Sequence, residues 1–194
     1  MSQVENTSAK VLIETNGYIG TKFLTPVVAN KLVTSTAMKL GTYTIAAQPI
    51  APSILSVGNT VVATADTMGT IDFVGTDITG ATISESVVPV ANSTVLTTKE
   101  FASVTSITGT GWVIGGATAD NIVVGTAGQT AGTGSYFCDV QITSATVVAS
   151  QTNKTGAITA NLALITSIPV GVYPTKVTYI ALTSGQGIGY LAKG

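Results

Sequence analysis

The sequence predicts an all-β protein, either an antiparallel β-sandwich or a jelly-roll-like barrel, with essentially no helix. Three observations support this class. Apolar and polar residues alternate with the two-residue period of a β-strand, most clearly between Thr70 and Thr108. Turn-forming residues recur about every eight to twelve residues, which is the spacing typical of sandwiches and barrels. No segment carries apolar residues at helical spacing over about three turns.

The clearest local structure is a hairpin followed by a return strand. Its two arms are Thr70–Thr76 and Thr82–Val88, and both alternate with the period of a strand. Between the arms, Asp77 can accept backbone hydrogen bonds at the start of a type I turn, and Gly80 can adopt the left-handed conformation that closes a bulged hairpin. The return strand is expected after a turn at residues 91–93.

Shorter strand-like segments precede and follow this hairpin, and most are bounded by Gly, Pro or Asn residues. They are Ala37–Leu40, Tyr43–Ala46, Ile54–Val57, Val61–Thr64, Trp112–Ile114, Ile122–Val124, Tyr136–Ile142, Thr146–Ala149, Ala157–Ile165 and Lys176–Tyr190.

Four regions are predicted along the chain. Residues 1–25 are polar at first and show no helical period, so we expect an extended N-terminal arm. The alternative is that Val11, Leu12 and Ile13 in this region form an edge strand of the main fold. Residues 26–126 are expected to form the β-sandwich core, and residues 127–134 a Gly-rich loop or linker. Residues 135–194 are then C-terminal strands that complete the sandwich or form a second small β domain.

The composition indicates a protein whose surface is partly covered by other protein surfaces. Apolar residues make up 45% of the 194 residues and charged residues only 9%, against about 25% charged residues in ordinary domains. Thr and Ser supply most of the polarity, which suits pleated sheets. The net charge of −1 leaves little self-repulsion to keep copies apart. We therefore expect contacts with copies of the chain or with other proteins.

The residue types argue against a catalytic, metal or cofactor site. The chain has no His, so a Ser nucleophile would lack its usual base. Its nine carboxylates are isolated from one another in the sequence, and no calcium-loop pattern occurs. Asp72 and Glu85 lie on the two arms of the hairpin and can face each other or Lys99. We interpret them as surface charges in preference to a catalytic pair.

Nucleic-acid and membrane binding are not expected. All eight basic residues are Lys, scattered from Lys10 to Lys193, whereas phosphate tracking needs a basic cluster. The apolar runs are shorter than the roughly 20 residues that span a bilayer. The N-terminal residues lack the features of a secretory signal. These features predict synthesis in the cytoplasm without a membrane anchor.

Four residues are candidates for binding a partner protein. Val11, Leu12 and Ile13 form an apolar strip in the N-terminal region that a neighbouring subunit can bury. Trp112 lies close to Gly109 and Gly111, and we interpret it as a core or interface anchor rather than a sugar-binding platform. The single Cys138 shares a strand face with apolar residues and is expected to be a buried, unreactive thiol.

Two stretches resemble a pattern found in small virion proteins of tailed bacteriophages. They are Gly69-Thr-Ile-Asp-Phe-Val-Gly-Thr-Asp-Ile-Thr-Gly-Ala-Thr-Ile-Ser-Glu85, which contains the hairpin, and Thr98-Lys-Glu-Phe-Ala-Ser-Val-Thr-Ser-Ile107. The closing segment Leu182–Tyr190 is similar to the last strand of such proteins. The resemblance covers about half of the chain and rests on strand and turn motifs.

The resemblance implies a structural role in the virion, with no enzymatic activity and no cofactor. Its first implication is a capsid decoration, or cement, protein that binds the phage head as a homo-oligomer, with a trimer as one candidate symmetry. The partners would then be the major capsid protein and copies of the chain itself, assembled in the host cytoplasm. The alternatives are a tail, neck or fibre component, or a carbohydrate-binding or receptor-binding module.

Overall fold

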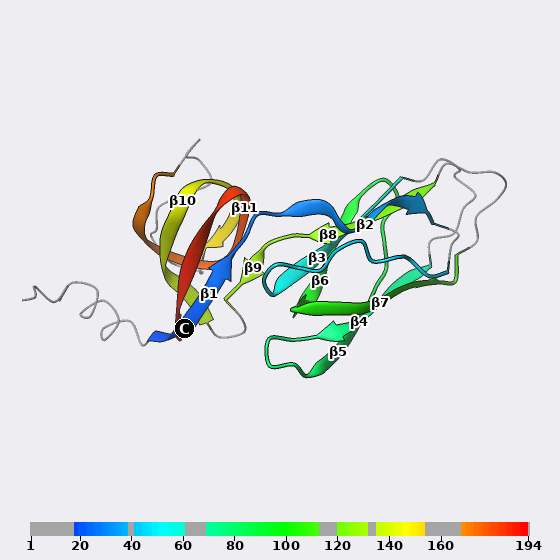
Figure 1. The fold of residues 1–194 in the computed structure, drawn as a ribbon, viewed down its shortest axis with the longest axis horizontal. Helices are drawn as coiled ribbons and strands as arrows, with labels where there is room; N and C mark the ends of the chain where they lie inside the picture. The colour runs from blue at the N-terminus through cyan, green and yellow to red at the C-terminus, as the bar shows by residue number, and fades with distance from the viewer. Residues whose placement is uncertain are drawn as a thin grey trace, which may run out of the picture. The chain divides into compact units, whose positions relative to one another are not determined.

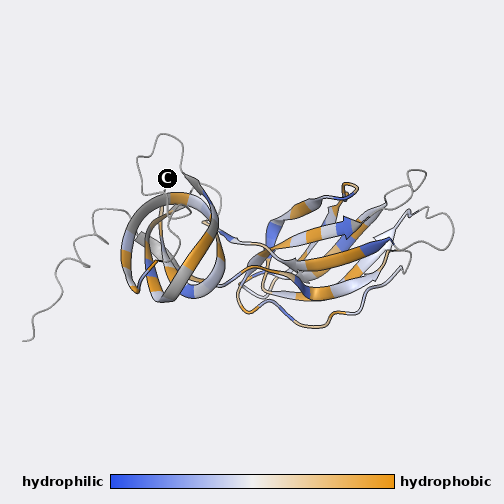
Figure 2. Ribbon diagram, turned by 90° about the horizontal axis from the view of Figure 1, so that it is seen from above, coloured by the Kyte–Doolittle hydropathy of each residue, from blue (hydrophilic) through white to orange (hydrophobic). Residues whose placement is uncertain are grey.

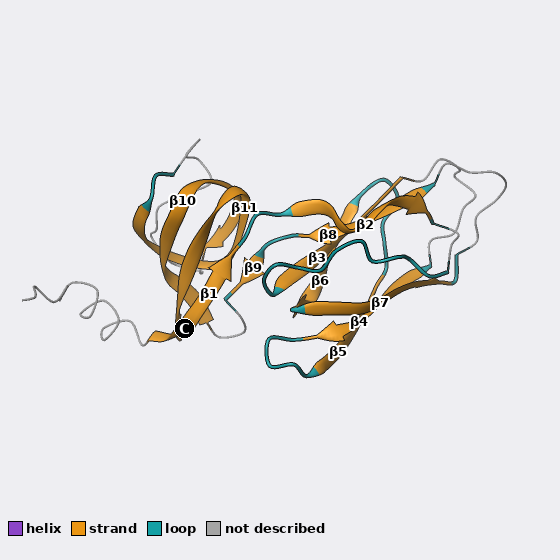
Figure 3. Cartoon of the chain, in the orientation of Figure 1, coloured by secondary structure: helices purple, strands orange, loops and turns teal. Residues whose placement is uncertain are grey.

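The computed structural model describes residues 18–38, 41–60, 69–112, 120–131, 135–153 and 168–193. Within these ranges every regular element is a β-strand and no helix occurs (Figure 3). The predicted all-β class is therefore confirmed. The described strands form three separate sheets that are built mainly by antiparallel pairing, which corresponds to the sandwich alternative and not to a closed barrel.

The strands are shown along the chain in Figure 1. They are β1 (Tyr18–Leu24), β2 (Val28–Ala37), β3 (Ser53–Thr60), β4 (Thr70–Thr76), β5 (Thr82–Val87), β6 (Thr94–Phe101), β7 (Ser103–Thr110), β8 (Asn121–Thr126), β9 (Gln129–Thr130), β10 (Ser135–Asn153) and β11 (Gly171–Lys193). The chain divides into two compact units. We call Val27–Gln129 the central unit, and Met1–Pro26 with Thr130–Gly194 the terminal unit.

These boundaries differ from the predicted ones at the N-terminal end. Tyr18–Leu24, which we expected to lie in an extended arm, forms β1 and pairs with β11. Strands β10 and β11 lie with β1 in the terminal unit and not in the sheets of the sandwich. The reason is long-range pairing, because β1 has its partner more than 160 residues later in the chain. The strip Val11–Ile13 lies outside the described residues.

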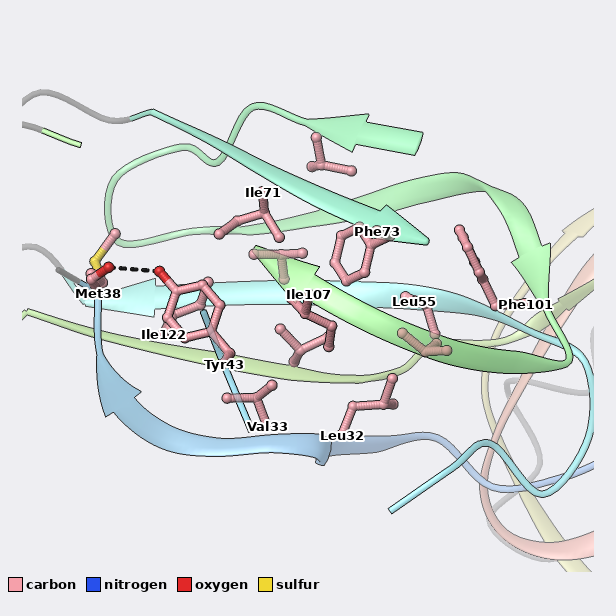
Figure 4. Packing of buried hydrophobic residues seen from close by; sticks show 14 residues of the cluster. Leu32, Val33, Met38, Tyr43, Leu55, Ile71, Phe73, Phe101, Ile107 and Ile122 are labelled. Carbon is pink, nitrogen blue, oxygen red and sulfur yellow. Dashed lines mark hydrogen bonds between the residues drawn. The ribbon is translucent and has the colours of Figure 1, made fainter. Parts of the chain in front are cut away.

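The central unit is a sandwich of two sheets. One sheet has the strand order β2-β8-β3-β6 and the other has the order β5-β4-β7. Large side chains from both sheets fill the space between them (Figure 4), and the fully buried ones include Leu32, Leu55, Ile71, Phe73, Phe101, Ile107 and Ile122. Burying a side chain of this size contributes about 1.5 to 3 kcal/mol. Apolar and polar residues alternate along these strands, as Figure 2 shows.

The hairpin has the turn that the sequence predicted. In the β4–β5 ladder Thr76 pairs with Thr82. The side-chain oxygen Oδ1 of Asp77 accepts hydrogen bonds from the backbone nitrogens of Thr79 at 2.8 Å and Ala81 at 3.0 Å. Gly80 has a φ of 84°, in the left-handed region. The prediction for this turn is therefore confirmed.

This geometry makes Gly80 more sensitive to substitution than its neighbour. A side chain at Gly80 meets no atom within 4 Å, so only its left-handed backbone opposes the change. We expect Gly80→Val to lower the free energy of unfolding by roughly 1 to 2 kcal/mol. The exposed Ala81 is the matched control, and Ala81→Val should have little effect. Equal losses in urea denaturation would show that the turn is not the cause.

One open side of the sandwich is bridged by two side chains. Glu85 on the edge strand β5 accepts hydrogen bonds from the backbone nitrogens of Thr98 at 2.7 Å and Lys99 at 2.8 Å, both on β6. In return, Lys99 Nζ donates to the backbone oxygen of Ser84 at 2.6 Å. The two sheets are thus joined at this side without a shared ladder.

The other open side is covered by residues 41–48, which connect β2 with the rest of the sandwich. The backbone nitrogen of Tyr43 donates to the oxygen of Ile107 on β7 at 3.0 Å, and that of Ala46 donates to the oxygen of Leu32 on β2 at 2.7 Å. The segment therefore contacts β2 and β7, which are the edge strands of the two sheets on this side. We predicted a strand at Tyr43–Ala46, but these residues form an irregular connection that links two sheets instead of extending one.

A side-chain amide covers a further part of the edge of β7. Gln48 donates from Nε2 to the backbone oxygen of Val104 at 2.9 Å and accepts from its backbone nitrogen at 2.8 Å. These two bonds reproduce those of a neighbouring strand. An exposed strand edge is a template for pairing with another chain, so this contact blocks one such site.

In the terminal unit, β10 and β11 pair with each other along two different edges. Residues 135–142 of β10 pair on one edge with residues 187–193 of β11, and on the other edge with residues 171–177. The strand β1 pairs with residues 187–192 of β11 on their remaining edge. The order across the sheet is therefore β1, the end of β11, the start of β10 and the start of β11.

Glycines on the inner face of this sheet make room for its core. Leu24 and Ile142 are fully buried, and Gly187 lies between them in the ladder. At Gly189 an added Cβ would lie 2.6 Å from a ring carbon of the buried Phe137. The absence of a side chain at Gly189 lets the Phe137 ring pack directly against β11.

Candidate interaction surface

The carboxylates on the predicted hairpin support the fold instead of forming a site. Glu85 pairs with the buried Phe73 in the ladder and so lies on the inner face at the sheet edge. Asp72 lies one position away on the outer face, where it accepts hydrogen bonds from the hydroxyls of Ser86 and Thr110. The expectation that Asp72 and Glu85 can face each other is therefore wrong, because neighbouring positions of a strand point to opposite faces. The expected approach of Glu85 to Lys99 occurs through the Lys99 backbone.

Asp77 is held as a carboxylate by its turn. The hydroxyl of Thr79 donates to it at 2.7 Å and lowers its pKa below the ordinary 3.8, and the backbone nitrogens of Thr79, Ala81 and Gly80 act in the same direction. Because the pKa is lower in the folded state, the ionised form stabilises the fold above the unfolded pKa. This contribution is lost as the pH falls through the folded pKa.

We expect Asp77→Asn to destabilise the protein at pH 7 and to lose most of that effect at low pH. The substitution removes the charge that the turn favours while keeping the side-chain shape. The measurement is the difference in denaturation midpoint between the wild type and the variant, taken from pH 7 down to about pH 2. A difference that stays constant over this range would show that the charge of Asp77 contributes nothing.

In the part of the chain that the structure describes, no group of three or more His, Cys, Asp or Glu residues could hold a metal ion. In the same residues, no helix is long and apolar enough to cross a membrane.

Trp112 belongs to the core of the central unit. Its half-buried indole packs against the hydrophobic cluster next to Tyr43. The hydroxyl of Tyr43 donates to the backbone oxygen of Met38 at 2.6 Å (Figure 4). Burial raises the pKa of Tyr43 to about 12, an effect that Trp112 partly opposes. The sequence left open whether Trp112 is a core anchor or an interface anchor. These contacts are those of a core anchor.

Cys138 is buried and its Sγ donates to the backbone oxygen of Tyr190 at 3.3 Å. We expect this thiol to react slowly with a thiol reagent in the native protein and rapidly after denaturation, since buried thiols in apolar surroundings are inert. A reagent that releases a coloured product when it reacts with a thiol allows both rates to be measured by absorbance. Equal rates in the two states would place the thiol at the surface.

Several large apolar side chains are exposed, and the sheet of the terminal unit brings some of them together. The exposed ones are Phe23, Val28, Ile50, Ile78, Val88, Val90, Leu96, Val170 and Val172. In the ladder of the terminal unit, Phe23 pairs with Ile188, Ile188 pairs with Gln141, and Gln141 pairs with Val172. Directly opposite residues share one face of a sheet, so these four side chains form a row across all four paired segments.

This row lies on the outer side of the sheet, opposite the core. Phe23 is 44% exposed and Val172 is 57% exposed, while Ile188 and Gln141 between them are half-buried. Tyr190 lies two residues after Ile188 on the same face and donates from its hydroxyl to Gln141 Oε1 at 2.8 Å. We call Phe23, Gln141, Val172, Ile188 and Tyr190 the outer face.

Sequence reasoning missed the outer face. Its residues come from three strands, and no local pattern marks them as neighbours. The sequence predicted a strand-like segment at Lys176–Tyr190, but it did not indicate which segments flank it. Of the predicted partner-binding residues, Trp112 lies in the central unit, and Val11, Leu12 and Ile13 lie outside the described residues.

No protein-family model matches this chain, and neither a curated protein nor a solved structure is detectably similar to it.

Proposed function

We propose that the protein is a structural component of a bacteriophage virion, a decoration protein that binds the outside of the head as a homo-oligomer and acts without catalysis. Many modest contacts between copies and with the major capsid protein would add up to a stable attachment. The observation that carries the proposal is that the carboxylates of the hairpin are engaged in hydrogen bonds within the fold.

The polar groups that would do chemistry in an enzyme are engaged in structural contacts. Asp72, Asp77 and Glu85 each accept hydrogen bonds that hold a turn, a strand pair or the side of the sandwich. A carboxylate that is tied to backbone nitrogens or to hydroxyls of its own sheet is not available as a general base. These three residues support a mechanical role.

The surface suits a protein that is packed at high local density. Low charge removes the repulsion that would keep many copies apart. The contacts of Glu85, Gln48 and residues 41–48 cover parts of the sandwich edges, and such cover prevents uncontrolled strand pairing between copies. The outer face then supplies a defined apolar contact.

The experiment adds the purified protein to phage heads that lack it and measures both occupancy and the temperature of genome release. The proposal predicts saturable binding and a higher release temperature. Binding restricted to the tail or neck would favour the tail alternative. Absence of binding to any part of the particle would refute a virion role.

A further inference from the structure

We propose that the folded central unit holds β1 in the sheet of the terminal unit, because it keeps the two ends of the connecting chain close together. The proposal concerns the path of the chain and does not depend on attachment to a particle. Among the described strands of the terminal unit, β1 alone precedes the central unit, whereas β10 and β11 follow it. The chain from β1 to its pairing partner β11 therefore passes through the whole central unit.

The terminal unit requires its two junctions with the central unit, Pro26 and Thr130, to lie close together when β1 is in place. Lys22 Nζ on β1 donates to the backbone oxygen of Thr130 at 2.7 Å. Leu24 at the end of β1 is fully buried in the core of this unit, and Pro26 forms a parallel bridge with Leu182 of β11. Docking of β1 therefore fixes both ends of the connection on one part of the terminal unit.

The central unit brings the same two junctions together through its own pairing. Its strands β2 and β8 are antiparallel neighbours, and Val28 lies opposite Thr126 in their ladder. The backbone nitrogen of Val28 also donates to Thr126 Oγ1 at 3.1 Å. Because the ladder joins these two residues, the connection from Pro26 to Thr130 is effectively only about six residues long while the central unit is folded.

The entropy of loop closure gives the size of the effect. When the central unit is unfolded, the connection between Pro26 and Thr130 is a flexible loop of about 100 residues. The probability that the ends of such a loop meet falls as about the 3/2 power of its length. Shortening the loop from about 100 to about six residues therefore favours docking of β1 roughly 70-fold. The coupling is reciprocal, so docked β1 favours the folded central unit by the same factor.

The test lengthens the connection in the full-length protein while both units stay folded. About 20 Gly and Ser residues are inserted between Pro26 and Val27, where the chain passes between the units. Hydrogen exchange of the β1 amides, measured by mass spectrometry on a peptide that contains Tyr18–Leu24, should become about ten-fold faster. The control carries the same insertion between Asn92 and Ser93, in an exposed turn of the central unit, and should leave β1 exchange unchanged.

A second variant separates the length of the connection from local damage at the junction. With about ten residues inserted between Pro26 and Val27, exchange of the β1 amides should become about four-fold faster, because the acceleration follows the length of the connection. Fluorescence of Trp112 and far-ultraviolet circular dichroism check that each variant keeps its fold. An acceleration that does not grow with the inserted length would overturn the proposal.

Two further results would also overturn it. Equal exchange of the β1 amides with the insertions at Pro26 and at Asn92 would show that pairing with β11 holds β1 without help from the central unit. Exchange that becomes faster in the β10–β11 ladder by as much as in β1 would show that the whole terminal unit loosens. The proposal predicts that the acceleration is confined to β1.

Discussion

Replacing Gly109 with Ala is expected to lower the free energy of unfolding by about 1 to 3 kcal/mol, the usual range for overpacking a filled core. Gly109 lies on the inner side of β7, where an added Cβ would lie 2.6 Å from the hydroxyl oxygen of Tyr43 and would also collide with the indole of Trp112. Neither ring can move away easily. Tyr43 is buried and donates to the backbone of Met38, and Trp112 packs on the same cluster.

Gly41→Ala is the matched control for this prediction. Gly41 accepts the backbone hydrogen bond of Gly109 at 2.9 Å, yet an added Cβ there would approach only the oxygen of Gly109, at 3.9 Å. The measurement is chemical denaturation followed by fluorescence of Trp112, the single tryptophan, which reports on the central unit. Equal shifts for Gly41→Ala and Gly109→Ala would contradict the packing of Tyr43 and Trp112 described above.

The second large effect is expected in the terminal unit. Gly189→Ala should also lower stability by about 1 to 3 kcal/mol, because its Cβ would overlap the buried ring of Phe137. The control is Gly171→Ala on the same face, where an added Cβ would make ordinary contacts of 3.5 Å and more with Tyr173. Circular dichroism during thermal unfolding measures both variants. A Gly171→Ala variant that is destabilised as much as Gly189→Ala would refute the special role of Gly189.

Local chemistry accounts for what the sequence predicted correctly. The hairpin arms, the role of Asp77 and the left-handed Gly80 depend on residues within about ten positions of one another, and turn rules apply directly at that range. The all-β class follows from the same alternation, repeated over several segments. The position of the turn at Asp77–Gly80 therefore follows from the amino-acid sequence alone.

Long-range pairing accounts for what the sequence did not predict. β1 was expected to lie in an arm because residues 1–25 are polar at first and show no helical period. Its pairing with β11 depends on residues far along the chain. The outer face forms because the two edges of β10 pair with the two ends of β11. No local pattern in the sequence indicates this pairing. Glu85 was interpreted as a surface charge, whereas its hydrogen bonds to β6 depend on how two sheets stack. In each case the missing information is which segments become neighbours.

A particle reconstruction tests the central claim, a structural role on the virion, most directly. Purified particles that contain the protein would be imaged, and the position and copy number of its two β units would be read from the density. The account predicts density for the chain on the outer surface of the head, in many symmetry-related copies that contact one another and the capsid protein. Density confined to the tail, or intact particles with no copies of the chain, would contradict it.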